Sequence, residues 1–342
     1  MGGFQTAIIG CGTICGIHAA AVQATPEARL AAVVDNDRQK VVAAAAQYDC
    51  RYYTDYRQML QDPQIDVVHI CTPHYLHAEM AKQALRSGKH VVLEKPMAIS
   101  LADAAELTRV ADKSGKQLGV CFQNRYNSTS LRIKSLLDSG QAGAVRHARA
   151  KLQWHRDAAY YRNSGWRGAW ATEGGGVLIN QAIHTLDLLQ WFVGELYRIE
   201  GATATNGLKG VIEVEDTAQA FLTFTNGVTA EFFATVCNAE NDPVEIELEC
   251  EQQTLKLAGD LTVVDRNGGV ELFAEQNVRT GAKAYWGCSH AALIADFYRC
   301  LQTGEPFALG GRAAITALKL VKAIYYSARN HRPVLWEDPG ID

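Results

Sequence analysis

One short segment near the N-terminus constrains the fold more than any other. An apolar run at residues 4–9 leads into the glycine turn G-C-G-T-I-C-G at 10–16, which opens a helical pattern. Gly10 permits the tight turn, Gly12 lets the backbone approach a pyrophosphate, and the N-terminus of the following helix supplies N–H donors. Asp35 ends the next apolar run, at about the 20-residue spacing expected for a carboxylate that binds an adenosine ribose. This order of elements predicts a dinucleotide-binding unit.

Two features modify this prediction. Cys15 stands at the third glycine position of the usual G-x-G-x-x-G pattern, where a small side chain still allows a helix to pack on a strand. A bare G-x-G is common, so the prediction depends on the strand, the helix and the acid around it. The Asp35 carboxylate repels a 2′-phosphate and favours NAD over NADP, although Arg38 can soften that repulsion.

The first 122 residues show a regular alternation of elements. Short runs rich in β-branched residues are separated by alanine-rich stretches of helical length; the runs lie at 4–9, 30–34, 67–71, 90–93 and 118–122. Such alternation predicts an α/β fold with a doubly wound parallel sheet, covered by helices on both faces. One helix is well delimited, because Ser100 can cap its start, Asp103 follows three residues later, and Gly115 can end it.

After residue 123 the pattern changes. Longer segments alternate apolar with polar residues, including 218–224 and 228–236 on either side of Asn226-Gly227, a dipeptide typical of tight hairpins. They predict a second, α+β domain with a large and mostly antiparallel sheet, and the chain should close with helices at 289–302 and 312–328. Because 342 residues exceed the usual size of a single core, we predict two domains, 1–122 and 123–342.

Composition excludes several classes of protein. A net charge of -4 provides no basic surface for nucleic acid, and no apolar run approaches the roughly 20 residues of a membrane span. The 9 cysteines are odd in number and scattered, with no C-x-x-C pair, which argues against a disulfide framework or a zinc site. We therefore expect a cytoplasmic protein with no bound metal, no nucleic-acid partner and no membrane association.

A lysine follows the fifth predicted strand, in the sequence Glu94-Lys95-Pro96. Ligands of open α/β sheets bind outside the carboxyl ends of the strands, and Pro96 keeps the preceding residue extended. A lysine at a strand end is usually only a solvated charge. Beside a nicotinamide ring, however, an amine there is suited to proton transfer with an alcohol.

A second group of polar residues lies in the C-terminal half. Glu173 and three glycines precede Asn180, His184 and Asp187, whose spacing of four and three residues places them on one face of a predicted helix that ends near Gly194. Either this face carries a reactive imidazole, or His184 is a structural histidine hydrogen-bonded to Asp187. A metal site is the weaker interpretation, since no second histidine completes it.

Aromatic and basic residues are interleaved between 154 and 170. The substrate-binding candidates in this segment are Arg156, Tyr161, Trp166 and Arg167. Aromatic faces stack on sugar rings, while the polar groups bind hydroxyls or an anionic group. A subunit contact rich in aromatic residues explains the same composition equally well.

Together these motifs resemble the Gfo/Idh/MocA oxidoreductase family, the glucose–fructose oxidoreductase and inositol dehydrogenase type, over essentially the whole chain. The matching features are Gly10-x-Gly12 with His18, Asp35, Cys71-Thr72-Pro73 followed by His77, Glu94-Lys95-Pro96, Asn124-Arg125-Tyr126, and Gly174-Gly175-Gly176 leading to His184 and Asp187. The resemblance implies an N-terminal Rossmann domain, and a C-terminal sheet that often mediates homodimers or homotetramers.

The resemblance also implies roles for individual residues. Lys95 would be the catalytic lysine and His184 the acid/base histidine. The implied cofactor-binding residues are Gly10, Gly12, Thr13, Ile14, Asp35, Arg38, Thr72, Pro73, His77, Glu94, Lys95 and Gln123. Many members have aspartate four residues before the histidine, whereas this chain has Asn180, whose amide can orient a hydroxyl but cannot act as a base. Lys95, His184 and Asn180 would also contact the substrate.

The expected function is hydride transfer between NAD, or less favourably NADP, and a secondary carbinol of a sugar, a cyclic polyol or a sugar nucleotide. Lys95 and His184 would carry the proton. Two alternatives stay open. One is a glycosidase that keeps its NAD bound and oxidises the sugar transiently. The other is a nucleotide-sensing regulator without catalysis, against which the presence of both Lys95 and His184 argues.

Overall fold

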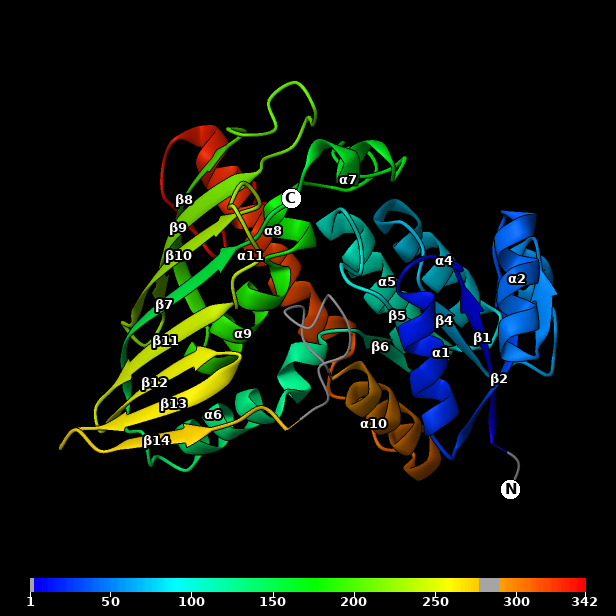
Figure 1. Ribbon diagram of the computed structural model, residues 1–342, viewed down its shortest axis with the longest axis horizontal. Coiled ribbons are helices and arrows are strands. Elements are labelled where there is room, and N and C mark those ends of the chain that lie inside the picture. Colours follow the sequence, from blue (N-terminus) through cyan, green and yellow to red (C-terminus); the bar gives the residue numbers. More distant parts are fainter. Residues whose placement is uncertain (1–2, 277–288) are drawn as a thin grey trace. The chain divides into compact units, whose positions relative to one another are not determined.

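The N-terminal part of the chain forms a six-stranded parallel sheet. The computed structural model describes residues 3–276 and 289–342 (Figure 1). The strands are β1 (Phe4–Ile9), β2 (Ala28–Val34), β3 (Arg51–Tyr53), β4 (Val67–Ile70), β5 (His90–Leu93) and β6 (Leu118–Val120). The helices with them are α1 (Cys15–Ala24), α2 (Arg38–Tyr48), α3 (Tyr56–Leu60), α4 (His74–Arg86), α5 (Leu101–Ser114) and α10 (His290–Thr303).

The strand order β3-β2-β1-β4-β5-β6 is that of a doubly wound dinucleotide-binding fold. The order reverses between β1 and β4, so the carboxyl ends of these two strands flank the expected ligand crevice. The predicted fold class is confirmed for this sheet. The strand β3 was not predicted, because R-Y-Y at 51–53 contains no apolar run and its first two residues are exposed.

Local sequence signals explain several element boundaries. The Ser100 hydroxyl oxygen accepts a hydrogen bond from the Asp103 backbone N–H at 3.1 Å, and Gly115 ends α5 with a φ of +66°. Between strands β9 and β10, Gly227 has a φ of +84° and the Asn226 side chain accepts from the Val228 N–H at 3.1 Å. Both turns are formed by the residues that predict them.

The chain divides into two units, and the division is not the linear one expected at residue 122. Unit 1 contains the chain up to Gln123 together with Ser289–Ile315, and unit 2 contains the described residues from Asn124 to 276 with Thr316–Asp342. The segment Ser289–Ile315 belongs to unit 1 because α10 packs on α1, and because the Val120 N–H donates to the Leu309 carbonyl at 2.9 Å. Sequence pattern alone does not reveal such a return.

Unit 2 is built on a nine-stranded sheet of order β14-β13-β12-β11-β7-β10-β9-β8-β15. Its strands are β7 (Val145–Gln153), β8 (Leu196–Ala204), β9 (Thr217–Phe224), β10 (Thr229–Thr235), β11 (Glu245–Cys250), β12 (Gln253–Ala258), β13 (Asp260–Asp265), β14 (Val270–Phe273) and β15 (Val334–Leu335). Its helical segments are η1 (Gln123–Tyr126), α6 (Ser128–Asp138), α7 (Ala158–Arg162), α8 (Val177–Asn180), α9 (Ile183–Val193) and α11 (Gly311–Asn330). Among the strand pairs that the structure describes in this sheet, only β7 and β10 are parallel, so the predicted mostly antiparallel sheet is confirmed.

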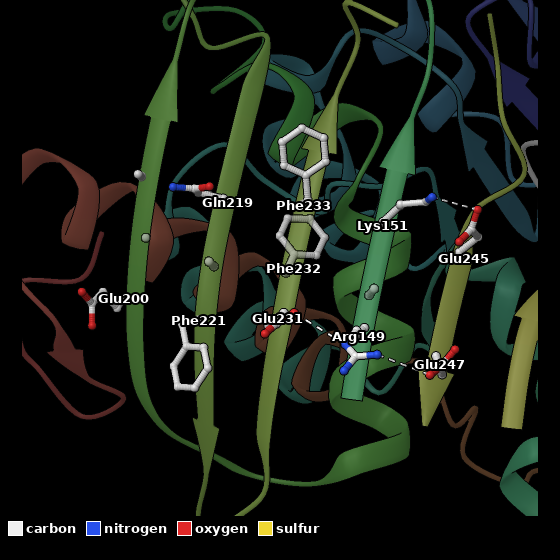
Figure 2. Close-up of a pocket in the computed structure, with 14 residues that line it drawn as sticks. Arg149, Lys151, Glu200, Gln219, Phe221, Glu231, Phe232, Phe233, Glu245 and Glu247 are labelled. Carbon is white, nitrogen blue, oxygen red and sulfur yellow. Dashed lines mark ion pairs between the residues drawn. The ribbon is translucent and has the colours of Figure 1, made fainter. Parts of the chain in front are cut away.

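The two faces of this sheet differ in chemistry. Alternate residues of β9 and β10 are buried under helices that lie along one face (Figure 1). The opposite face is a shallow hollow lined by charged and aromatic side chains, among them Arg149, Lys151, Phe221 and Phe233 (Figure 2). Across the described part of the chain, no helix is both long and apolar enough to cross a bilayer.

Candidate functional site

The glycine turn lies directly after β1, as predicted. Gly10 has a φ of +98°, and a Cβ added there would lie 2.6 Å from the Cys71 carbonyl oxygen. A Cβ added to Gly12 would meet nothing within 4 Å, so the backbone at Gly12 borders open space. Thr13 and Ile14 complete the turn before α1, and the buried Cys15 packs where many related turns have a third glycine. The turn therefore has the open backbone and the following helix N-terminus that a bound pyrophosphate requires.

The Asp35 carboxylate is held against this turn. One oxygen accepts a hydrogen bond from the Cys11 N–H at 2.8 Å, and the other accepts from the Asp37 N–H at 2.9 Å. Arg38 begins α2 three residues later. The structure therefore brings the turn and the predicted ribose-binding acid together within unit 1.

His77 connects the two loops that follow β4 and β5. Its Nδ1 lies 2.7 Å from the Pro96 carbonyl oxygen and its Nε2 lies 2.8 Å from the Thr72 carbonyl oxygen. Burial lowers the pKa of His77, while both carbonyl groups act in the opposite direction. A neutral imidazole donates from only one nitrogen, so His77 hydrogen-bonds one of these two carbonyl groups and contacts the other. His77 thereby positions the backbone at Pro96, just after Lys95, and at Thr72, just before Pro73, in addition to any contact with a cofactor.

Glu94 ends a buried chain of hydrogen bonds that the sequence did not reveal. His18 Nε2 lies 3.0 Å from Glu94 Oε1, and His18 Nδ1 lies 2.9 Å from His69 Nδ1. His69 Nε2 lies 3.0 Å from the Tyr298 hydroxyl, which lies 2.5 Å from the Thr6 hydroxyl. An ionised Glu94 only accepts, so each neutral ring must donate toward it, and every hydrogen bond in the chain then runs in one direction, from Thr6 to Glu94.

The directions of the pKa shifts in these groups agree with that order of donors and acceptors. Burial alone raises the pKa of Glu94, but hydrogen bonds from His18 and His290 hold it well below its usual range. Burial lowers the pKa of His18 and of His69, which keeps both rings neutral. Glu94 also accepts a hydrogen bond from the Lys95 backbone N–H at 3.3 Å, so this Glu94 network anchors the backbone of the half-buried lysine.

The same network contains a possible metal site. Within residues 3–276 and 289–342, His18, Glu94 and His290 are the one group of at least 3 His, Cys, Asp or Glu side chains whose possible metal-ligand atoms all lie within 4.8 Å of one another. Protons on both Nε2 atoms satisfy Glu94 without an ion. The expected absence of a metal stays a prediction.

In unit 2, Asn180 and His184 lie on two helices rather than on one. The helix α8 ends at Asn180 and α9 begins at Ile183, because the Ala182 N–H bonds back to the Val177 carbonyl at 2.8 Å and breaks the regular ladder. The prediction of one continuous helical face was therefore wrong. The Asn180 side-chain amide donates to Glu173, a buried carboxylate that also accepts from the Gly168 N–H.

Asp187 has a different partner from the one that sequence spacing indicates. Its two oxygens accept hydrogen bonds from Arg125 Nε at 2.8 Å and Arg125 Nη2 at 2.6 Å. This bidentate ion pair ties α9 to η1, one helical turn beyond His184, which is 8% exposed. The role of Arg125 was not predicted, although its N-R-Y motif was noted.

Two buried carboxylates hold the glycine loop before α8. Burial raises the pKa of Glu173 to about 7 and that of Glu215 to about 7. Glu215 accepts from the Gly176 and Leu178 N–H groups, each at 2.9 Å, and from the Tyr325 hydroxyl at 2.7 Å. These contacts fix the backbone that leads to His184.

The interleaved aromatic and basic residues gather around Tyr160, which lies in the same segment but was not among its predicted substrate-binding residues. The guanidinium carbons of Arg156 and Arg167 lie 5.1 Å and 4.7 Å from the centre of its ring, and the ring of Tyr161 lies edge-on at 5.0 Å. Arg167 also covers the ring of Trp166 at 4.4 Å. The predicted substrate-binding residues of this segment are thus brought together within unit 2.

The last predicted cofactor ligands lie at the ends of strands in unit 1. Thr72 and Pro73 follow β4, and Gln123 lies just beyond β6. Gln123 is 3% exposed, and its Oε1 has no hydrogen-bond partner in the described residues. Buried acceptors without a partner are rare in proteins.

This fold and this glycine turn define a two-domain dinucleotide-binding protein. Residues 4–122 match the oxidoreductase family with an NAD-binding Rossmann fold, Gfo/Idh/MocA, and residues 130–256 match the Gfo/Idh/MocA C-terminal domain. The chain belongs to the Gfo/Idh/MocA oxidoreductase family, as its motifs predicted.

Three relatives show how far the similarity extends. The uncharacterized oxidoreductase YrbE of Bacillus subtilis is 31% identical over 232 residues, which are 66% of this chain and 65% of that protein, just under two thirds of its length. D-apiose dehydrogenase of Paraburkholderia graminis is 27% identical over 97% of this chain and 89% of its own. The WlbA dehydrogenase of Bordetella pertussis, solved with NADH and UDP-GlcNAcA, has a TM-score of 0.85 and 27% identity, covering 97% of this chain and 98% of its own.

Proposed function

We propose that this protein is a dehydrogenase that uses NAD to oxidise a secondary carbinol of a sugar or sugar derivative, or to reduce the corresponding ketone. The glycine turn with Asp35 carries the proposal, because the open backbone at Gly12 and the held carboxylate fit the pyrophosphate and the ribose of a dinucleotide. Relatives named as a sugar dehydrogenase and as a dehydrogenase solved with NADH support it. The Asp35 carboxylate favours NAD over NADP.

In the proposed reaction, bound NAD would take the hydride from the carbinol carbon. Lys95, held by the Glu94 network and by His77, would donate a hydrogen bond to the reacting oxygen. His184 would accept the hydroxyl proton and return it during reduction. Asn180 cannot ionise, so its amide would orient a hydroxyl, with Glu173 fixing the amide in place.

The test is a panel of sugars, inositols and sugar nucleotides with NAD and NADP, followed by nicotinamide absorbance. We expect NADH to accumulate with at least one carbinol. Lys95→Ala and His184→Ala should each lower kcat by about 10²–10⁴-fold while NAD binding is retained. Release of an aglycone without net NADH would identify a glycosidase instead. Normal turnover in both variants would refute the assigned roles.

We also propose that a second copy of the chain covers the open face of the nine-stranded sheet. This face combines Phe221, which is 40% exposed, with ion pairs of both signs, such as Arg149 to Glu247 at 3.5 Å and Lys151 to Glu245 at 3.1 Å (Figure 2). A surface carrying both charges can complement itself across a two-fold axis. Analytical ultracentrifugation should show a dimer or tetramer that Phe221→Glu dissociates.

A matched substitution controls for that experiment. Tyr52 is 43% exposed on the edge strand β3 in unit 1, and Tyr52→Glu should leave the assembly unchanged. A monomeric parent protein would refute the proposed interface. We propose further that the protein resides in the cytoplasm, since every cysteine of the described residues is a free thiol, as in a reducing compartment.

A further inference from the structure

Two guanidinium groups meet at one aromatic ring in unit 2. Arg156 and Arg167 both lie over Tyr160, and each also covers a tryptophan, Trp154 at 5.2 Å and Trp166 at 4.4 Å. Aromatic faces hold a guanidinium in a fixed plane while leaving its N–H edge able to bind a planar anion. Placing two cations beside one ring is unfavourable unless an anion is also present. We call Arg156, Tyr160, Tyr161, Arg167 and Gln181 the Tyr160 cluster.

The carboxylates near the Tyr160 cluster accept hydrogen bonds from backbone and side-chain amide groups. Asp157 caps α7 by accepting from the Tyr160 N–H at 2.8 Å, and Asp242 accepts from the Asn238 side chain at 3.0 Å. Glu173 accepts from Gly168 and Asn180, and its pKa of about 7 leaves it only partly charged at neutral pH. The charge of Arg167 also acts on Glu173 and lowers its pKa, against the larger effect of burial. The cluster therefore carries an excess of positive charge.

Buried polar atoms of the cluster point to a ligand. Tyr161 and Gln181 are each 4% exposed, and neither the Tyr161 hydroxyl nor Gln181 Oε1 has a hydrogen-bond partner in the described ranges. The buried Nε of Arg167 also has no hydrogen-bond partner in the described residues. Burial raises the pKa of Tyr161, so its hydroxyl keeps the proton and can donate it to an anion. Buried polar atoms without partners are rare in proteins unless a ligand or water binds them.

The cluster is also joined to the proposed acid/base residue. Gln181 Nε2 lies 3.4 Å from the Tyr160 hydroxyl, a long hydrogen bond, and His184 follows Gln181 by three residues. The cluster and His184 therefore belong to the same unit, and Gln181 is the cluster residue nearest to His184 along the chain.

From these observations we infer that the Tyr160 cluster binds an anionic group of the substrate, a carboxylate or a phosphate. This inference rests on the proposed function and narrows it: the substrate is an acidic sugar, such as a uronate, a sugar phosphate or a nucleoside diphosphate sugar, rather than a neutral sugar or polyol. Arg167 is the principal determinant, because its buried Nε has no hydrogen-bond partner in the described residues, whereas Arg156 Nη1 already donates to the Asn241 side chain and to the His155 carbonyl; Arg156 adds its charge.

The experiment compares matched neutral and anionic probes. Glucose, glucuronate, glucose 6-phosphate, UDP-glucose and UDP-glucuronate are tested with NAD, and the last four separate a carboxylate from a phosphate as the recognised group. We expect at least one anionic probe to have a kcat/KM more than about tenfold above that of glucose. Arg167→Gln should raise its KM by roughly 10- to 100-fold, with the value for glucose changed less than about twofold.

Two further variants make the result specific. Arg162 is exposed at the end of α7 in the same segment, and Arg162→Gln should leave all KM values unchanged. Arg167→Lys keeps the charge but loses the bidentate geometry, so its KM should lie between those of the parent and Arg167→Gln. A thermal unfolding curve shows whether Arg167→Gln is folded. If it is not, the Arg167→Lys variant still tests the inference.

Direct binding separates this inference from the proposed function. Calorimetry with the NAD-loaded protein should show that glucuronate or a UDP-sugar binds to the parent and binds weakly to Arg167→Gln. If binding behaves so but no probe is turned over, the anion site stands and the dehydrogenase assignment fails. The inference is overturned if glucose equals the anionic probes, if Arg167→Gln weakens neutral and anionic probes alike, or if none of the anionic probes binds.

Discussion

Alanine substitutions at the two glycines of the dinucleotide turn should separate folding from cofactor binding. At Gly10 the φ of +98° is unfavourable for any residue with a side chain, and the new Cβ would lie 2.6 Å from the Cys71 carbonyl oxygen and 2.9 Å from its carbon. Backbone atoms cannot move aside as a side chain can. At Gly12 the new Cβ meets nothing within 4 Å, so the folded protein accommodates it.

The two costs can be estimated from this geometry. The left-handed conformation costs about 1–2 kcal/mol, and overpacking against backbone costs about 1–3 kcal/mol, so Gly10→Ala should lose roughly 2–5 kcal/mol of unfolding free energy. For a unit of this size that corresponds to a fall in Tm of roughly 5–15 °C. Gly12→Ala should change stability by less than about 0.5 kcal/mol. Its methyl group instead occupies space that a pyrophosphate needs, which should weaken NAD binding by roughly 10- to 100-fold.

Thermal unfolding without NAD and calorimetric titration with NAD measure the two effects independently. The reasoning predicts that Gly10→Ala shifts Tm, and that Gly12→Ala keeps the parent Tm but loses affinity. If Gly12→Ala bound NAD as tightly as the parent, the turn would not hold the pyrophosphate. If Gly10→Ala unfolded at the parent Tm, the positive φ and the close approach to Cys71 would not describe this turn in solution.

Three further predictions follow from the buried polar groups. Asp187→Asn leaves the Arg125 guanidinium buried without its counterion and should cost about 3–5 kcal/mol in urea unfolding, whereas Asp138→Asn, in an exposed pair, should cost less than about 1 kcal/mol. Burial raises the pKa of Glu173 to about 7, so its contribution to the free energy of unfolding is complete below the unfolded pKa near 4.5 and is lost as pH rises through 7. Between pH 5.5 and 8 the parent protein should therefore lose about 2 kcal/mol more unfolding free energy than Glu173→Gln. Equal losses in the two proteins would contradict a buried carboxyl group at this position. Elemental analysis should find no stoichiometric metal, and chelators should leave Tm unchanged, because hydrogen bonds satisfy the polar groups of the Glu94 network. If a chelator removed a bound metal and lowered Tm at the same time, this interpretation of the network would be wrong.

Much of unit 1 could be predicted because its signals are local. A strand, a glycine turn, a helix and an acid at fixed spacing identify the dinucleotide unit, and Ser100 and Gly115 delimit a helix through capping that involves only neighbouring residues. The strand β3 was not predicted, because its mostly exposed side chains form no repeating pattern of apolar residues. The break between α8 and α9 was not predicted, because the spacing of the residues also fits one continuous helix. The hydrogen bond from the Ala182 N–H to the Val177 carbonyl reveals the break.

By itself the sequence determined the class of fold, the family and the turn that would hold a dinucleotide, since all of these depend on patterns repeated or spaced along the chain. Tertiary structure alone decided which polar groups pair. Arg125 rather than His184 binds Asp187, His290 reaches Glu94 from a segment 196 residues away, and two arginines meet at Tyr160. Such pairings form where distant segments bury charge together, and the free energy of burial depends on surroundings that no local pattern records.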